Sequence, residues 1–154
     1  MATTRAPVNE EEFLAALYKG GELLAAGKIV EARGFLEKVK SLGGRIAIVT
    51  NRWNNLCEDT KENFRLQQLP FDVILCRVDN GDKNPRFASV ASGVAFGDNK
   101  AREVLAFVGD NILDIPTQKQ SLRDAPDAAF DLFGKLYFVL PNPMYGSWQQ
   151  NPAR

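Results

Sequence analysis

The chain has 154 residues, of which 45% are hydrophobic and 25% are charged, and its 19 basic side chains balance its 19 acidic ones. This length and composition predict a single domain over residues 1–154 with a proper core. The balanced charge and the lack of a basic stripe argue against nucleic acid as a partner. The sequence contains no histidine, so chemistry here must use carboxylates, Lys, Arg, hydroxyls or a metal.

The sequence predicts a cytoplasmic protein. No stretch is long and apolar enough to span a membrane. Residues 1–12 have no apolar segment behind a basic head, so we expect no signal peptide. The two cysteines, Cys57 and Cys76, form neither a disulfide framework nor a zinc motif. Because Cys76 falls in an apolar run, we expect a small buried thiol there.

Two helices and a strand are expected in the first third of the chain. Residues 1–8 read as a flexible lead, and Asn9 then caps an amphipathic helix. A second helix is predicted over residues 30–42, where apolar side chains fall on one broad face. The apolar run at residues 46–49 follows at once. Such runs are typical of strands buried on both faces, as in a parallel sheet covered by helices.

Strands alternate with helical segments along the rest of the chain. The expected strands are residues 71–76, 104–108 and 136–140, and the expected helices are residues 57–68 and 87–93, with short helical pieces in a loop over residues 121–134. This alternation predicts the α/β class.

Polar side chains follow the strand at residues 46–49. Thr50, Asn51 and Arg52 come directly after it, and ligands of parallel sheets bind at the carboxyl ends of the strands. A hydroxyl, an amide and a guanidinium together are suited to hold a phosphoryl group. The alternative is a polar turn in which Asn is favoured for its conformation.

A glycine and two carboxylates follow the strand at residues 104–108. Gly109 permits a sharp bend, Asp110 then lies at the edge of the sheet, and Asp114 comes one turn later. Such carboxylates suit Mg²⁺, which takes one or two of them and fills its other positions with water and phosphate oxygens. The alternative is a strand-to-helix turn in which Asp is the N-cap. The similar segment at residues 97–99 has no strand before it, so we expect no site there.

Two further pairs of side chains are candidates for ligand binding. Lys83 and Arg86 share a loop before a short helix, and a lysine there can neutralise charge that develops in phosphoryl transfer. The alternative is a solvated cation. Tyr145 and Trp148 offer flat surfaces for stacking, or they anchor the C-terminal tail on the core.

In this order, these segments resemble the haloacid dehalogenase superfamily of phosphatases. They are most similar to the class C bacterial acid phosphatases, which include lipoprotein 5′-nucleotidases. The resemblance runs from about residue 9 to residue 148. Its most specific segments are residues 46–52, the Lys83-x-x-Arg86 pair, residues 108–114 and residues 134–148. It implies a three-layer Rossmann-like α/β fold and Mg²⁺-dependent hydrolysis of a small phosphomonoester or nucleotide through an aspartyl-phosphate.

The resemblance also implies roles for individual residues. The family residue that matches Thr50 holds the transferring phosphate, and the one that matches Lys83 steadies it. The residue matching Asp110 binds Mg²⁺ with the one matching Asp114 close by, and Tyr145 falls where an aromatic side chain clasps the nucleoside. The expected phosphate- and substrate-binding set is Thr50, Asn51, Arg52, Lys83, Arg86, Tyr145 and Trp148.

One family feature is missing from this chain. Enzymes of this family open with a strand ending Asp-x-Asp, whose first Asp attacks phosphorus and whose second is the acid–base. Here no aspartate occurs before Asp59. We therefore expect the chain to be inactive, or nearly so, on its own. The signal that exports family members to the bacterial periplasm or outer membrane is also missing, and we expect both features upstream of Met1.

The missing strand has a structural consequence. In the family it lies in the middle of the sheet, between the strands that match residues 46–49 and 104–108. Without it two inner strands are left with unpaired backbone groups, each costing roughly 1–3 kcal/mol when buried. Three outcomes are open. The two strands pair directly with each other, they pair with something else such as a second copy of the chain, or the chain folds poorly. The other hypotheses are a non-catalytic phosphate- or nucleotide-binding protein and an unrelated flavodoxin-like or receiver-type domain.

Overall fold

The computed structural model describes residues 29–140, so the helix predicted after Asn9, and Tyr145 and Trp148, lie outside the described residues. The helices and strands are α2 (Ile29–Ser41), β1 (Ala47–Trp53), α3 (Cys57–Leu66), β2 (Val73–Arg77), α4 (Asn84–Ser92), β3 (Phe107–Gly109) and β4 (Tyr137–Val139). Short 3-10 helices are η1 (Asn54–Leu56), η2 (Val94–Phe96), η3 (Ile112–Asp114), η4 (Gln120–Asp124) and η5 (Asp127–Phe130). The α/β class is confirmed.

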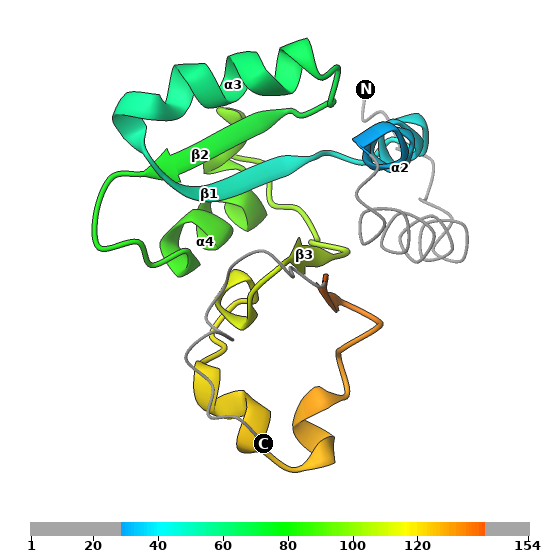
Figure 1. The fold of residues 1–154 in the computed structure, drawn as a ribbon, viewed down its shortest axis with the longest axis vertical. Helices are drawn as coiled ribbons and strands as arrows, with labels where there is room; N and C mark the ends of the chain where they lie inside the picture. Colours follow the sequence, from blue (N-terminus) through cyan, green and yellow to red (C-terminus); the bar gives the residue numbers. More distant parts are fainter. Residues whose placement is uncertain (1–28, 141–154) are drawn as a thin grey trace.

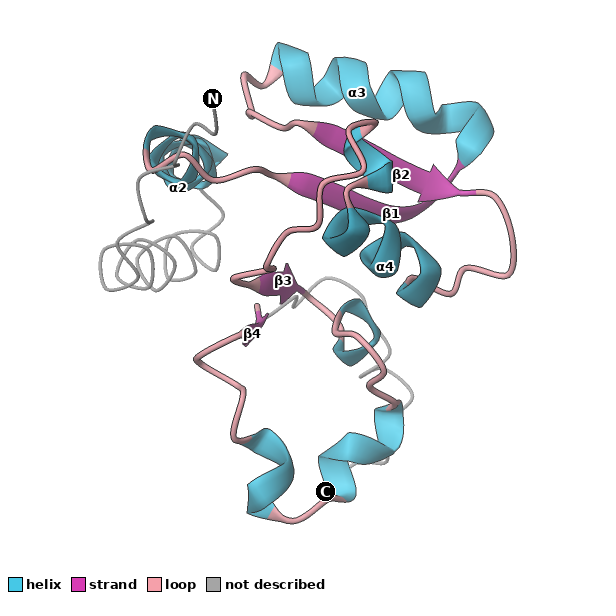
Figure 2. Cartoon of the chain, turned by 180° about the vertical axis from the view of Figure 1, so that it is seen from behind, coloured by secondary structure: helices cyan, strands magenta, loops and turns pink. Residues whose placement is uncertain are grey.

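The strands form two separate parallel pairs. β1 pairs with β2, with Ala47 opposite Val73, and β3 pairs with β4, with Phe107 opposite Tyr137. β1 and β3 run in the same direction (Figures 1 and 2) but share no ladder of hydrogen bonds. The expected parallel pairing is therefore confirmed, but the sheet is small and divided. Of the outcomes expected for a missing central strand, direct pairing of the two inner strands is not the one observed.

Helices cover both faces of the β1–β2 pair. α3 lies on one face and α4 on the other (Figure 1), which gives three layers. Ile74 on β2 is buried beneath α3, together with Cys57 and Cys76, and Phe64 of α3 packs on this cluster. The hydroxyl of Thr60, also buried, donates to the carbonyl oxygen of Leu56. This layering makes α3 and β2 one packed unit.

A disulfide joins this unit covalently. Cys57, the first residue of α3, is bonded to Cys76 on β2, with their Cα atoms 5.9 Å apart. The expectation of a buried free thiol at Cys76 was wrong. The burial was predicted correctly, but the sequence spacing could not show that the start of α3 folds back beside β2.

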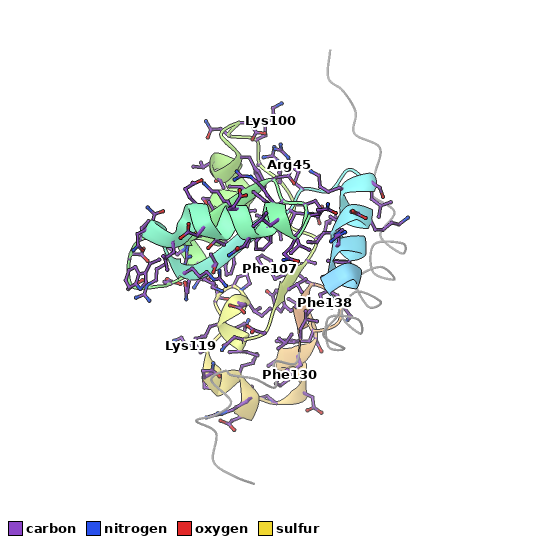
Figure 3. All side chains as sticks on the ribbon, turned by 45° about the horizontal axis from the view of Figure 1, so that its top comes forward. Arg45, Lys100, Phe107, Lys119, Phe130 and Phe138 are labelled. Carbon is purple, nitrogen blue, oxygen red and sulfur yellow. A yellow bond between two sulfur atoms is a disulfide. The ribbon has the colours of Figure 1, made fainter. Side chains whose placement is uncertain are left out.

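A second cluster holds the two strand pairs together near the start of β1. Val39 of α2 and Ile46 are buried there, and Ala106 and Phe138 from the β3–β4 pair pack against them. In Figure 3, Phe107 and Phe138 lie above the segment that carries Lys119 and Phe130. We call residues 110–136 of this segment the lower loops. The two pairs therefore meet through side chains rather than through backbone hydrogen bonds.

Asp72 connects α2, β1 and β2 beside that cluster. Its carboxylate accepts hydrogen bonds from the N–H of Ile46 (2.7 Å) and from Nζ of Lys40 (2.6 Å). Burial by itself raises the pKa of Asp72, but these two hydrogen bonds and the positive charges of Lys40 and Arg45 together outweigh it, so the pKa lies below its usual value. The ionised carboxylate is thus the form that holds the three elements.

A chain of aromatic contacts links α4 to the lower loops. Phe87 of α4 meets Phe107 edge to face at 5.3 Å between ring centroids, and Phe107 meets Tyr137 at 6.0 Å. Tyr137 then contacts Phe133 at 5.6 Å, and Phe133 contacts Phe130 at 5.4 Å. The Phe130–Phe133 pair is tilted and the other three pairs are edge to face. Each edge-to-face pair adds about 0.5–1.5 kcal/mol beyond its buried area. They secure loops that have little regular structure.

Candidate active site

The first turn of α4 brings the ends of β1 and β3 to one place. Lys83, the N-cap of α4, donates from Nζ to Oδ1 of Asp114 at 2.5 Å. Arg86 in the same turn donates to the carbonyl oxygen of Thr50 at 2.6 Å. Asn84 accepts a hydrogen bond from the N–H of Thr117 at 2.8 Å. Residues predicted from two different strand ends therefore gather at the same edge, although the strands themselves are not paired.

Arg86 is bound on several sides. Besides Thr50, its guanidinium donates to Oδ1 of Asn51 (2.7 Å) and to the carbonyl oxygens of Gly81 (3.3 Å) and Asp82 (3.2 Å). Burial lowers the pKa of Arg86 below its usual value, and the nearby acids Asp79 and Asp82 oppose that shift. These contacts make Arg86 a support for the end of β1. Its binding to phosphate, and that of Asn51, stays a prediction.

Asp114 lies in a capping box at the start of η3. Its Oδ2 accepts hydrogen bonds from the N–H groups of Asp110 and Asn111, both at 3.2 Å, and the Asn111 side chain accepts from the N–H of Leu113 at 3.0 Å. A Cβ at Gly109 would come within 2.3 Å of Cβ of Asp114. Glycine is therefore required at this position by close approach, in addition to the bend expected from the sequence.

At least one of the two expected Mg²⁺ ligands, Asp114, is engaged by other groups. Asp110 is exposed at the end of β3, but both oxygens of Asp114 already accept hydrogen bonds, one from Lys83 and the other from backbone N–H groups. Within residues 29–140 no three acidic or cysteine side chains are close enough to hold a metal. The described residues thus do not fit a two-carboxylate Mg²⁺ site unless Asp114 changes partners.

The end of β1 differs from the expectation in its length. The strand continues to Trp53, with a register shift between Val49 and Trp53, so Thr50, Asn51 and Arg52 lie in the strand and not after it. The irregular register explains how a strand can carry a local turn, in which Oγ1 of Thr50 accepts from the N–H of Arg52 at 3.2 Å. The Arg52 side chain is exposed.

Sequence reasoning missed two side chains near this edge. Trp53 is 50% exposed, and the guanidinium of Arg77 lies 4.0 Å from the centroid of its ring. The position of Trp53 directly after Thr50-Asn51-Arg52 could have indicated that it lies near the site. Lys135 lines the same groove as Lys83 and Asp114, but a single lysine in a loop carries no signal of its own.

A groove of about 790 Å³ lies beside these residues. Ala47, Ile48 and Val49 of β1 form part of its wall, and residues 104–108 form another part. Its polar lining includes Lys83, Asp114 and Lys135. The candidate site therefore opens into a largely apolar groove.

The segment at residues 97–99, where we expected no site, forms an ion-pair cluster. Asp98 pairs with Arg102 and with Arg45, and both guanidiniums lie 4.7 Å from the centroid of the Phe96 ring. The hydrogen bond from Arg102 and that from the N–H of Lys100 hold the pKa of Asp98 well below its usual value. This ion-pair cluster is a structural connection.

Two comparisons identify the family. The profile of the haloacid dehalogenase (HAD) superfamily, subfamily IIIB (acid phosphatase), matches residues 5–148. The chain is also similar to a crystal structure of the class C acid phosphatase from Bacillus anthracis with tungstate bound, at 29% identity and a TM-score of 0.58 over 77% of this chain. It spans 50% of the length of that protein. The resemblance drawn from the sequence is confirmed: the chain belongs to the acid phosphatases of HAD subfamily IIIB.

Proposed function

We propose that the edge formed by the ends of β1 and β3 and the first turn of α4 binds the phosphate group of a small phosphomonoester or nucleotide. The observation that carries this proposal is the position of Lys83. Its ammonium is held by Asp114 at 2.5 Å, the two side chains are only 14% and 15% exposed, and both line the groove. A partly desolvated cation attracts an oxyanion more strongly than a solvated one. Thr50 and Lys83 are the proposed phosphate ligands.

The reaction proposed for the family site is hydrolysis of the phosphomonoester with a divalent metal. Acid phosphatases of this superfamily generally use such a metal. Asp110 is the residue of this chain that we propose to contact Mg²⁺. When bound, the ion would neutralise negative charge on the phosphate. Because Asp114 is engaged by Lys83 and by backbone N–H groups, we expect the chain alone to bind Mg²⁺ weakly.

We expect little or no turnover from this chain alone. Nucleophilic catalysis needs a carboxylate within reach of the phosphorus, and no aspartate precedes Asp59 in this sequence. The second candidate function is binding of phosphate or a nucleotide without turnover. The position of Lys83 at the groove favours it, since a lysine can hold an anion, whereas no aspartate precedes Asp59 to supply an attacking group.

Calorimetric titration with tungstate, a phosphate mimic, tests the binding site. We expect saturable binding that Lys83→Ala weakens at least about tenfold, because each tenfold corresponds to about 1.4 kcal/mol and a charge-assisted contact contributes this much or more. Lys119→Ala, a change at an exposed lysine in the lower loops (Figure 3), is the matched control and should leave binding unchanged. Equal binding by the wild type and Lys83→Ala would remove Lys83 from the site.

An aryl phosphate assay with Mg²⁺ tests turnover separately. We expect hydrolysis at the background rate. Brisk hydrolysis would contradict the expected inactivity and would leave the binding proposal standing.

The disulfide bears on localisation. No helix within residues 29–140 is long and apolar enough to cross a membrane. Disulfides persist mainly in oxidising compartments and are rare in the cytosol. The Cys57–Cys76 bond therefore supports an oxidising compartment over the cytoplasmic localisation expected from the first residues. Alkylation of free thiols in lysed cells that express the protein tests this, and two reactive cysteines would contradict it.

A further inference from the structure

The loop that joins β2 to α4 (Figure 1) contains the only Asn-Gly pair in the sequence, Asn80-Gly81. Asn80 is exposed, so water reaches its side chain. Gly81 has a φ of +87°, a conformation that other residues disfavour, and a Cβ there would come within 3.3 Å of Cζ of Arg77. Glycine is therefore required after Asn80, and it leaves the backbone nitrogen next to the asparagine unshielded by a side chain.

Two hydrogen bonds prepare Asn80 and Gly81 for a reaction with each other. The N–H of Asp82 donates to Oδ1 of Asn80 at 3.0 Å. This bond closes a ring that contains both Cγ of Asn80 and the backbone nitrogen of Gly81, so a side-chain rotation that separates the two atoms must break it. The N–H of Gly81 donates to Oδ1 of Asp79 at 3.1 Å. The nitrogen thus has a carboxylate beside its proton, and the side-chain carbonyl of Asn80 has a donor on its oxygen.

We propose that Asn80 is a self-modification site, at which the fold promotes loss of the side-chain amide as ammonia. Asp79 is the general base, and the N–H of Asp82 stabilises the charge that develops on Oδ1 of Asn80. A base within hydrogen-bond reach of the proton that it removes is the requirement for general base catalysis. A donor already placed at the developing oxyanion is the requirement for its electrostatic stabilisation. The inference does not depend on phosphate binding.

The reaction uses atoms of the chain and one water molecule. The nitrogen of Gly81 bonds to Cγ of Asn80, its proton passes to the Asp79 carboxylate, and the carbonyl electron pair moves onto Oδ1. The carbonyl then re-forms, the bond from Cγ to Nδ2 breaks, and Nδ2 takes the proton from Asp79 and leaves as ammonia. The product is a cyclic imide. Water opens this imide at Cγ, which gives aspartate, or at the main-chain carbonyl, which gives isoaspartate.

The modification reaches the candidate active site through Arg86. Its guanidinium donates to the carbonyl oxygens of Gly81 at 3.3 Å and Asp82 at 3.2 Å, and also to that of Thr50 at 2.6 Å. Isoaspartate inserts a methylene into the main chain before Gly81, which displaces the first two carbonyls. Arg86 therefore holds the end of β1 less firmly in the modified chain.

Residues 98–100 supply a matched control inside the same chain. Oδ1 of Asp98 accepts a hydrogen bond from the N–H of Lys100 at 3.1 Å, which is the arrangement found in the loop after β2. Asn99 lies between them and is also exposed. The residue after Asn99 is a lysine, whose side chain hinders attack by its own backbone nitrogen. We expect Asn99 to stay unmodified under conditions that convert Asn80.

Incubation of the full chain at neutral pH, followed by a short tryptic digestion and mass spectrometry, measures the conversion. Trypsin releases residues 78–83 and 87–100 as separate peptides, because each follows an arginine and ends in a lysine. A capped synthetic peptide of residues 78–83 reports the rate without the fold. We expect the protein to convert at least about tenfold faster than this peptide, since a well-placed general base contributes about 100-fold or more.

A substitution of the base tests the role of Asp79. Asp79→Asn keeps a hydrogen-bond acceptor but removes the base, so conversion of Asn80 should slow towards the rate of the peptide. Asp124→Asn, at an exposed carboxylate in the lower loops, should leave the rate unchanged. The proposal would be overturned by a protein that converts no faster than the peptide, by equal rates in Asp79→Asn and the wild type, or by conversion of Asn99 as fast as that of Asn80.

NMR tests the effect on Arg86. In incubated protein we expect a second set of amide signals for Thr50 and Arg86, with a share equal to the modified fraction measured by mass. Asn80→Gln, whose longer side chain cyclises slowly, should keep a single set after the same incubation. A single set in fully converted wild-type protein would overturn the connection to the active site.

Discussion

Loss of the Cys57–Cys76 disulfide should destabilise the protein substantially. The bond closes a loop between cysteines 19 positions apart in the sequence. In the chain-entropy description, opening a loop of this length costs roughly 3 kcal/mol, because the unfolded chain gains freedom. That is a large share of the 5–15 kcal/mol typical of a domain. The effect should appear mainly at α3, whose first residue the bond fixes to β2.

Urea denaturation followed by circular dichroism, with and without dithiothreitol, measures this cost. With a slope near 2 kcal/mol per molar, 3 kcal/mol corresponds to a fall in the midpoint of roughly 1.5 M. The double variant Cys57→Ala/Cys76→Ala is the control, since its midpoint should be low and insensitive to the reductant. Two titratable thiols in protein that has not been exposed to a reductant, together with a urea midpoint that dithiothreitol does not change, would contradict this reasoning.

Three further substitutions, with Gly34→Ala as a control for the first, test the supports of the fold and the site. Gly109→Ala should lower the free energy of unfolding in urea by about 1–3 kcal/mol, because the new Cβ would overlap Asp114. Gly34→Ala in α2, where a Cβ meets nothing within 4 Å, should instead raise it by about 0.5–1 kcal/mol. Asp72→Asn should cost about 1–2 kcal/mol at neutral pH. Folding lowers the pKa of Asp72, so its contribution to the free energy of unfolding is present above the pKa of the unfolded state and is lost as the pH falls through the pKa of the folded state. The urea midpoint of Asp72→Asn should therefore decline less steeply towards acid pH than that of the wild type. An unchanged acid profile would contradict this. Arg86→Lys should cost about 2 kcal/mol, since an ammonium cannot replace a forked set of hydrogen bonds, and wild-type stability would show that these bonds contribute little.

The pattern of the sequence was sufficient for elements with a clear helical period or a continuous apolar run. The strand expected at residues 71–76 is observed as Val73–Arg77 and the helix expected at residues 30–42 as Ile29–Ser41. In the helix apolar side chains recur at helical spacing, and the strand is a short continuous apolar run that follows Pro70; both patterns are strong signals in a single sequence. The strand expected at residues 104–108 is shorter, because β3 begins only where it pairs with β4 at Phe107.

The parts that could not be predicted depend on contacts between distant residues. Nothing local shows that Arg86 holds Thr50, or that Lys83 binds Asp114, since their partners lie 36 and 31 positions away. The Cys57–Cys76 bond was missed for the same reason. The candidate site could be located from strand ends, but the partners that engage its side chains needed the structure.

The bridge made by the first turn of α4 has a mechanical consequence. The first turn of α4 binds the end of β1 through Arg86 and the turn after β3 through Lys83. The distance between these two places is therefore set by α4, although β1 and β3 are not hydrogen-bonded to each other. Away from this end, apolar packing around Val39 connects the two strand pairs, and the edge-to-face contact of Phe87 with Phe107 adds a further link. The first turn of α4 therefore fixes the distance between the end of β1 and the turn after β3, and with it the width of the groove beside Lys83 and Asp114.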